Sequence, residues 1–224
     1  MKLVLLLTFC ILPFLTHGQV TDKTSKYASA TMALGGGMGN VSIDFFHLWK
    51  LGKQKKFEVG LGGRLTSVFG SNQYFSSAPP DLARNNNYVD SVFLGSVQIN
   101  ALNIALGFGY SLSSKFSVGF NIDAIGVSFG STQQGAYIKD LQRTNTTASP
   151  TVFNVLLVDV NDRGTLNSEF YARYKLSEKW LLKIGLQHVF TEYSTNAQVQ
   201  QVPQPNDRFR RIVNMFSLGV TRRF

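Results

Sequence analysis

Cysteine is nearly absent from this 224-residue chain, and the one cysteine, Cys10, lies in an apolar run near the N-terminus. That run follows a lysine and precedes small residues, which is the pattern of a cleaved secretory signal. A membrane anchor is a weaker reading because the run is short and polar sequence follows at once. We therefore expect residues 1–18 to be a signal peptide and residues 19–224 to form one mature domain. The mature chain then contains no disulfide and no cysteine-based metal site.

Long hydrophobic runs are also missing after residue 18, and no stretch reaches the roughly 20 apolar residues of a membrane helix. The hydrophobic residues instead recur with period two. Phe116, Val118, Phe120 and Ile122, for example, alternate with small or polar residues. This is the pattern of strands with one apolar and one polar face, although alternation also occurs in soluble sandwiches.

The aromatic residues separate these two classes. Three short basic segments, 50–56, 111–115 and 175–179, each have an aromatic residue on both sides. Rings with a polar edge favour the headgroup level of a membrane, and a belt of them at one end of a barrel is an aromatic girdle. The segments are thus predicted to be short periplasmic turns. The predicted girdle consists of Trp49, Phe57, Tyr110, Phe116, Tyr174, Trp180 and Phe224.

These turns predict an all-β fold, an eight-stranded antiparallel up-and-down transmembrane β-barrel. The strands are expected at residues 27–36, 41–50, 56–70, 91–110, 116–130, 165–176, 180–194 and 210–224. Proline, which cannot donate a ladder hydrogen bond, falls only in the expected long loops after residue 18. A ten-strand count is an alternative, but it turns residues 175–179 to the wrong side.

Two regions fit this scheme less well. The apolar phase flips between Val97 and Leu102 and again between Ile122 and Ile125, which indicates bulges or the level at which strands leave the bilayer. Residues 151–160 are too apolar for a plain surface loop. They are expected to pair with residues near 125–138 above the membrane or to fold over the barrel mouth.

The C-terminal sequence MFSLGVTRRF alternates and ends in Phe224. It resembles the signal that the outer-membrane insertion machinery recognises, apart from Arg222, which stands where another aromatic is common. With the girdle, the mature chain resembles the small bacterial outer-membrane β-barrel domain family of OmpX and OmpA type. The resemblance implies residence in the bacterial outer membrane and contact with its lipid and lipopolysaccharide. It leaves open a structural, adhesive or surface-interaction role, lipid modification, and a narrow solute channel.

An eight-stranded barrel is only wide enough for side chains to fill its interior. We expect inward-facing charges to pair there, because an unpaired buried ion costs several kcal/mol. The lumen is therefore predicted to be plugged by a polar network, which argues against a general channel. The residues of this predicted lumen network are Glu58, Arg64, Asp123, Glu169, Arg173, Lys175 and Lys183.

The net charge of +9 does not indicate nucleic-acid binding, because the basic residues crowd the turn end without a strip of stacked aromatics. We predict no catalytic residues, no metal site and no cofactor, since the corresponding motifs are missing. Lipid A deacylases carry a lipid-facing His and Ser, which residues 188–196 resemble faintly. The spacing differs, however, and only Ser194 and Glu192 could assist His188, so a headgroup contact is the preferred role for His188. The expected contact surface for an unidentified ligand is formed by loops 71–90, 131–164 and 195–209.

Overall fold

The computed structural model of the chain describes residues 23–140, 142–157 and 161–224. The expected signal peptide lies outside the described residues. The helices with described bounds are two short pieces, α2 (Pro80–Ala83) and η2 (Asn86–Tyr88). Neither is long and apolar enough to cross a membrane.

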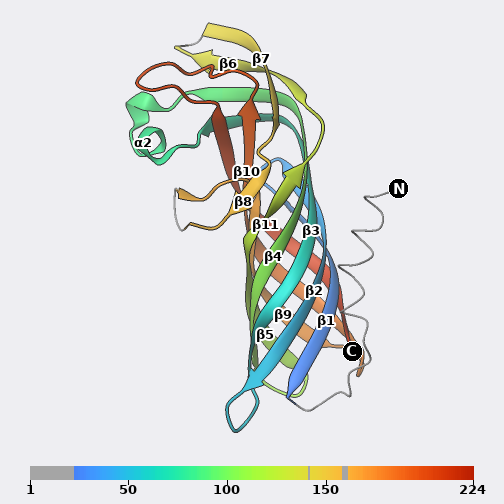
Figure 1. Ribbon diagram of the computed structural model, residues 1–224. Helices are drawn as coiled ribbons and strands as arrows, with labels where there is room; N and C mark the ends of the chain where they lie inside the picture. The colour runs from blue at the N-terminus through green and yellow to red at the C-terminus, as the bar shows by residue number, and fades with distance from the viewer. Residues whose placement is uncertain (1–22, 141, 158–160) are drawn as a thin grey trace, which may run out of the picture.

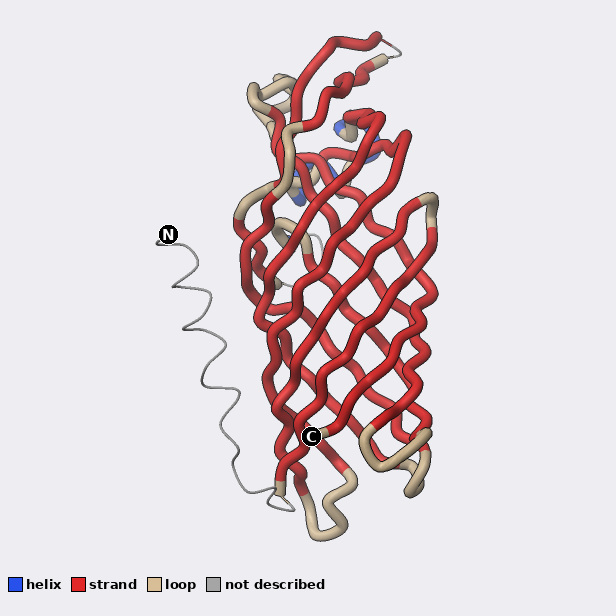
Figure 2. The backbone as a smooth tube through the Cα atoms, turned by 90° about the vertical axis from the view of Figure 1, so that its right-hand side faces the viewer, coloured by secondary structure: helices blue, strands red, loops and turns tan. Residues whose placement is uncertain are grey.

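Eight strands form a closed antiparallel barrel (Figures 1 and 2). Each barrel strand pairs with the next, and β11 pairs with β1 to close the ring. The predicted eight-stranded up-and-down fold is therefore confirmed, and the ten-strand alternative is wrong. The barrel strands are β1 (Thr24–Gly35), β2 (Met38–Leu51), β3 (Phe57–Ser77), β4 (Ser91–Ser111), β5 (Phe116–Phe129), β9 (Leu166–Lys175), β10 (Trp180–Thr195) and β11 (Arg208–Arg223).

The three basic turns lie together at the end of the barrel that also holds the C-terminus (Figure 2). The turn between β2 and β3 passes through a left-handed backbone at Gly52, where φ is 78°. Glycine takes this conformation without the steric cost that a side chain brings. The glycine at position 52 therefore suits the conformation that this turn requires. We refer to this end of the barrel as the turn end.

At the opposite end, β6 (Gln133–Lys139) and β7 (Gln142–Pro150) form a hairpin that fits between two barrel strands. β6 pairs with the outer part of β4, and β7 pairs with the outer part of β10. On the other side, β11 pairs with β3 beyond the tip of the β1–β2 hairpin, through Phe209 opposite Ser77. Strands β3, β4, β6, β7, β10 and β11 thus close a second, narrower ring above the barrel. We refer to this ring, with α2 and η2, as the head (Figure 1).

The head corrects the expectation that residues 131–164 form a long loop. The hairpin was missed because β7 is mostly polar on both faces and the apolar residues of β6 form one short run, residues 136–138, so that neither strand shows apolar alternation. Residues 153–155 form a short strand, β8 (Phe153–Val155), which pairs with Ile125–Val127 of β5. Of the two alternatives for residues 151–160, pairing near residue 125 is therefore confirmed for β8, while residues 158–160 lie outside the described residues.

The two expected irregularities have different origins. In β5, Ala105 pairs with Asp123 and Ile104 with Ile125, so Ala124 is bulged out, as predicted. In β4, by contrast, the pairing with β3 stays in register through residues 97–102. Val97, Ile99 and Ala101 point inward just as Asn103 does. The apparent flip marks the height at which the interior changes from an apolar filling in the head to a polar filling in the barrel.

Candidate functional site

The barrel interior contains charged side chains that are as deeply buried as the core residues of a soluble protein. Six of the seven residues of the predicted lumen network are at most 5% exposed, and so is Asp44 of β2, which the prediction omitted. The omission was avoidable, because Asp44 alternates with outward-facing Ile43 and Phe45 and so has the inward phase. The six residues are Glu58, Arg64, Asp123, Glu169, Arg173 and Lys183.

Lys183 of β10 lies at the centre of one cluster. Its Nζ donates to Glu169 Oε2 at 2.7 Å and lies 3.5 Å from Asp44 Oδ2, so one ammonium serves carboxylates from β9 and β2. Glu169 also accepts from Ser217 Oγ at 2.9 Å and from Gln187 Nε2 at 3.3 Å. These residues come from four strands, so the cluster ties opposite walls of the barrel together.

Arg64 of β3 is the centre of a second cluster. Its Nη1 lies 3.4 Å from Asp123 Oδ1 and donates to the backbone carbonyl of Asn167 at 3.0 Å, and its Nη2 donates to Asn121 Oδ1. Asp123 Oδ2 accepts from Asn103 Nδ2 at 2.8 Å and from the backbone N–H of Asn167 at 2.9 Å. Both the guanidinium and the carboxylate thus have ionic and neutral partners, which a buried ion pair requires.

Arg173 is held mainly by aromatic rings. Its guanidinium carbon lies 4.1 Å from the ring centre of Tyr27 and 5.0 Å from that of Tyr171. Its nearest carboxylate oxygen, on Glu58, is 4.0 Å from Nη2, and Glu58 is itself bonded by Ser25 Oγ at 2.6 Å. Tyr171 fits because its cross-strand partner on the neighbouring β5 is Gly119, where a Cβ would stand 2.4 Å from the tyrosine hydroxyl.

Lys175 does not join this network. It lies at the end of β9, and its Nζ donates to the exposed Glu178 in the following turn at 2.6 Å. That hydrogen bond lowers the pKa of Glu178 below its usual value. Lys175 is therefore a residue of the turn end.

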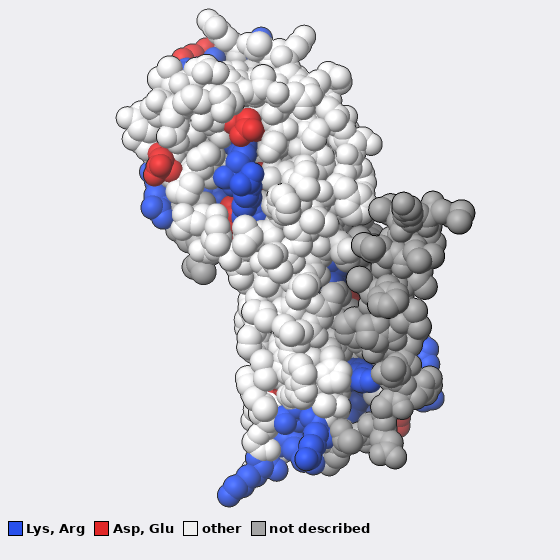
Figure 3. Space-filling model, viewed as in Figure 1, with Lys and Arg blue, Asp and Glu red and all other residues white. Residues whose placement is uncertain are grey.

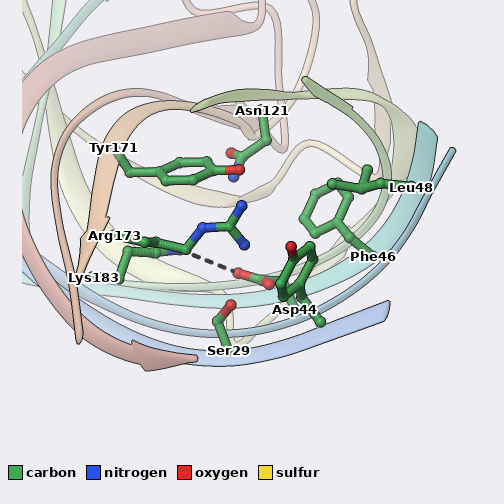
Figure 4. A pocket seen from close by; sticks show the side chains of 9 residues that line it. Ser29, Asp44, Phe46, Leu48, Asn121, Tyr171, Arg173 and Lys183 are labelled. Atoms are coloured by element: carbon green, nitrogen blue, oxygen red, sulfur yellow. Dashed lines mark hydrogen bonds and ion pairs between the residues drawn. The ribbon is translucent and has the colours of Figure 1, made fainter. Parts of the chain in front are cut away.

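The interior network has four carboxylates, Asp44, Glu58, Asp123 and Glu169, and three cations, so its formal charge is negative by one. The space left between these side chains is small. A cavity of about 10 Å³ lies between them. Figure 4 shows side chains that line it, among them Ser29, Asp44, Asn121, Tyr171, Arg173 and Lys183. Such a volume holds roughly one water molecule.

The predicted girdle residues lie at the turn end on the outer face of the barrel, where all seven are between 37% and 51% exposed. Several are direct neighbours across strands. Phe57 pairs with Tyr110, and the rings of Phe116 and Tyr174 lie 4.8 Å apart. The register between strands thus converts residues far apart in sequence into one belt.

The head has an apolar core that includes Phe75, Leu94, Tyr193 and Phe209. The rings of Phe75 and Tyr193 meet edge to face at 5.2 Å. Burial raises the pKa of Tyr193 to about 12, although its hydroxyl oxygen accepts a hydrogen bond from the backbone N–H of Gln98 at 3.0 Å, which lowers the pKa. At the rim, Arg208 holds Glu192 through two hydrogen bonds of 2.9 Å.

His188 lies on the outer face of β10, where its Nδ1 is 2.7 Å from Asn214 Oδ1. The two residues that the sequence suggested as helpers are engaged elsewhere, Glu192 with Arg208 and Ser194 Oγ with Thr151. Ser168 of β9, which the sequence analysis missed, instead faces His188 directly across the strand pair. The alternation of β9 could have revealed Ser168, because it places this serine on the outward side of the strand, as His188 is on β10.

No group of three or more His, Cys, Asp or Glu side chains within the described ranges could hold a metal ion. The acidic residues of the interior are instead interleaved with cations, as the clusters above describe.

No protein-family model and no curated protein matches the chain. The solved structures similar to it include Ail, the attachment invasion locus protein of Yersinia pestis, at 8% identity and a TM-score of 0.39, with 91% of this chain and 100% of that chain covered. Neisserial surface protein A follows at 9% identity and a TM-score of 0.38, covering 90% and 96% of the two chains. A major outer membrane protein from Thermus thermophilus has 16% identity and a TM-score of 0.42, covering 90% and 99%. At these values the likeness identifies no function.

Proposed function

We propose that the chain is an integral outer-membrane protein with a closed interior, whose head provides a structural, adhesive or other contact surface outside the cell. The observation that carries this proposal is the inversion of polarity across the barrel wall. The charged residues of the network are buried inside, whereas apolar side chains such as Leu186, Phe170 and Phe216 face outward at 61–65% exposure. Water favours the reverse arrangement, and hydrocarbon favours this one.

The height of the apolar surface fits a bilayer. Along β10 the outward residues run from Trp180 to Phe190. Ten steps of about 3.3 Å, tilted by roughly 40° from the barrel axis, rise about 25 Å. An apolar band about 25 Å tall is the usual dimension of an outer-membrane barrel. The turn end then faces the periplasm, and the head projects from the opposite leaflet.

Two features support a closed interior. The cavity between Asp44, Arg173 and Lys183 has room for roughly one water molecule. Above them, the apolar core of the head covers the barrel mouth with residues such as Phe75 and Phe209 that are 0% exposed. A dewetted apolar layer over a paired polar layer opposes ion flow. We therefore expect no conductance in planar bilayers, and stable single-channel steps at neutral pH would replace this proposal with the solute channel.

Location and partners follow as part of the same proposal. The expected signal peptide exports the chain, the C-terminal strand ending in Phe224 engages the insertion machinery, and outer-membrane lipid and lipopolysaccharide surround the apolar band. Phe224 lies 50% exposed on the barrel surface at the turn end, where another protein can reach it. We propose no nucleic-acid partner. The ligand of the head is not specified by its chemistry.

The experiment that tests membrane embedding is a charge scan of the outer face. Leu186→Arg places a guanidinium in the apolar band, and we expect it to lower the unfolding free energy in lipid vesicles by about 2–4 kcal/mol. The control is Val202→Arg, a site in the loop between β10 and β11 with a similar exposure of 63%. Urea titration measures both. The proposal would be wrong if both variants lowered the unfolding free energy by the same small amount, or if the wild-type chain stayed dissolved without detergent.

A lipid-active enzyme is the second candidate, and one observation favours it. Ser168, His188 and Asn214 lie in one row across β9, β10 and β11 on the outer face. Asn214 Oδ1, 2.7 Å from Nδ1, favours the tautomer that leaves Nε2 as the base. Ser168 could then attack an ester carbonyl while Nε2 takes its proton, the alcohol leaving with that proton and water later releasing the acid.

Against this candidate, the Ser168 hydroxyl donates to the backbone carbonyl of His188 at 3.4 Å, so the serine must rotate before it can react. The test is release of fatty acid from phospholipid or lipopolysaccharide in mixed micelles. Loss of product in both Ser168→Ala and His188→Asn would support the enzyme, and absence of product with the wild-type chain would dismiss it.

A further inference from the structure

The turn end has an extreme imbalance of charge. Among the described residues, this end exposes one side-chain carboxylate, that of Glu178, and it is already bonded to Lys175. Its basic residues come from all three turns and from the two chain ends beside β1 and β11, which the strand order spaces around the barrel. Figure 3 shows Lys and Arg side chains gathered at this end on the face in view. The basic residues of the turn end are Lys23, Lys26, Lys50, Lys53, Lys55, Lys56, Lys115, Lys175, Lys179, Arg222 and Arg223.

Arg222 differs from the lysines of the turn tips because it is in the outward row of β11, among the apolar side chains. Its guanidinium carbon lies 5.8 Å from the ring centre of Trp180 and 5.0 Å from that of Phe224. Its partner on β1 is Ala28, a side chain too small to cover it. The two rings therefore hold the guanidinium against the barrel wall at the level of the girdle.

Lys26 of β1 and His47 of β2 lie beyond Arg222, on the other side of the seam where β11 meets β1. The backbone N–H of Phe224 donates to the carbonyl of Lys26 at 3.0 Å, and Lys26 is the cross-strand partner of His47. The ring of His47 lies 5.0 Å from that of Trp49. Basic and aromatic side chains thus alternate along the outer face of four neighbouring strands. We refer to Trp180, Arg222, Phe224, Lys26, His47 and Trp49 as the seam patch.

We propose that the seam patch, within the basic ring of the turn end, binds the phosphate groups of anionic phospholipids in the leaflet that surrounds the turn end. The inference rests on the proposed membrane embedding. Aromatic rings at a bilayer interface lie beside headgroups, and a guanidinium between them meets phosphate oxygens with its paired donors. A ring of charge around the whole perimeter fits lipid, which surrounds the barrel, better than an acidic protein, which contacts one side.

Bromolipid quenching tests this proposal, because the chain has two tryptophans and both belong to the seam patch. Trp49→Phe leaves Trp180 as the only tryptophan, beside Arg222. The variant is reconstituted into vesicles of phosphatidylcholine with a minor share of phosphatidylglycerol, in which one or the other lipid is brominated. Each basic group at an anionic surface favours the charged lipid roughly fivefold at low salt. We therefore expect phosphatidylglycerol to be preferred beside Trp180 by at least about fivefold.

Adding Arg222→Gln is expected to reduce that preference by roughly fivefold, and Arg222→Lys by less. Lys53→Gln, at the tip of a turn away from Trp180, is the control and should change the preference by less than about twofold because its charge is screened. Circular dichroism verifies that each variant is folded.

Equal quenching by the two brominated lipids, or a preference that survives Arg222→Gln, would overturn the proposal. Equal quenching with salt-sensitive binding of polyglutamate to the vesicles would assign the basic ring to an acidic protein instead. Failure of membrane embedding looks different, because neither lipid would quench Trp180 while aqueous iodide would.

Discussion

Lys183→Met is the most informative perturbation of the barrel interior. Lys183 is 2% exposed and lies within 3.5 Å of carboxylates on two other strands. Methionine fills a similar volume without the charge, so the substitution leaves Glu169 and Asp44 buried with no ammonium between them. Removing one partner of a buried ion pair costs about 3–5 kcal/mol.

The expected loss is at the lower end of that range. Glu169 keeps three neutral donors, Ser217 Oγ, Gln187 Nε2 and Asn121 Nδ2, at 2.9, 3.3 and 3.3 Å. Hydrogen bonds from neutral groups compensate part of the lost ionic interaction. We therefore expect Lys183→Met to lower the unfolding free energy by about 3 kcal/mol. In the double variant with Glu169→Gln, the two effects should be non-additive by at least about 1 kcal/mol.

The assay is urea unfolding of the barrel in vesicles, followed by tryptophan fluorescence, together with conductance in planar bilayers. Lys175→Met is the matched control, because this lysine is 26% exposed and its partner Glu178 is 86% exposed. It should leave the unfolding free energy nearly unchanged. A loss under about 1 kcal/mol for Lys183→Met would refute the reasoning, since it would mean that water already solvates both carboxylates.

Three further predictions concern the head and the C-terminus. The raised pKa of Tyr193 means that the folded head favours the neutral phenol, so we expect its stabilisation to be complete below about pH 10 and to disappear as the pH rises toward about 12, measured by absorbance in the near ultraviolet and thermal unfolding. Phe75→Ala should cost about 3–5 kcal/mol and loosen the head before the barrel, so that amide exchange rises first in β6 and β7; simultaneous loss of β1 and β2 protection would contradict this. Deletion of Phe224 should reduce assembly in cells while leaving folding into vesicles intact, and equal losses in both assays would speak against recognition of this residue by the insertion machinery.

Much of the fold could be predicted because the wall of a barrel imposes a pattern on each local stretch of sequence. Each barrel strand separates two environments, so its residues alternate, and the aromatic residues beside the basic turns mark where strands end. In β10, for example, Trp180, Leu182, Ile184 and Leu186 have the outward phase throughout. The same phase was sufficient to place Arg64 and Lys183 inside, and it could have placed Asp44 there as well.

The head could not be predicted in this way. Its hairpin, β6–β7, has polar residues on both faces, and the pairing of β11 with β3 joins residues that are far apart in the chain, such as Phe209 and Ser77. The flip near Val97 was visible in the sequence, but it became interpretable only once the pairing of β3 with β4 was seen to be regular.

The sequence by itself thus determined the alternation, the eight barrel strands and the end that holds the basic turns, because these depend on which side of one strand each residue faces. Only the tertiary structure decided which charges meet. Lys183 joins Glu169 and Asp44, and Arg222 lies between Trp180 and Phe224, because strand register and ring closure bring distant segments together. Neither register across the seam nor the closure of the head is encoded in any local stretch, since both are set by contacts that form only when the whole sheet has closed.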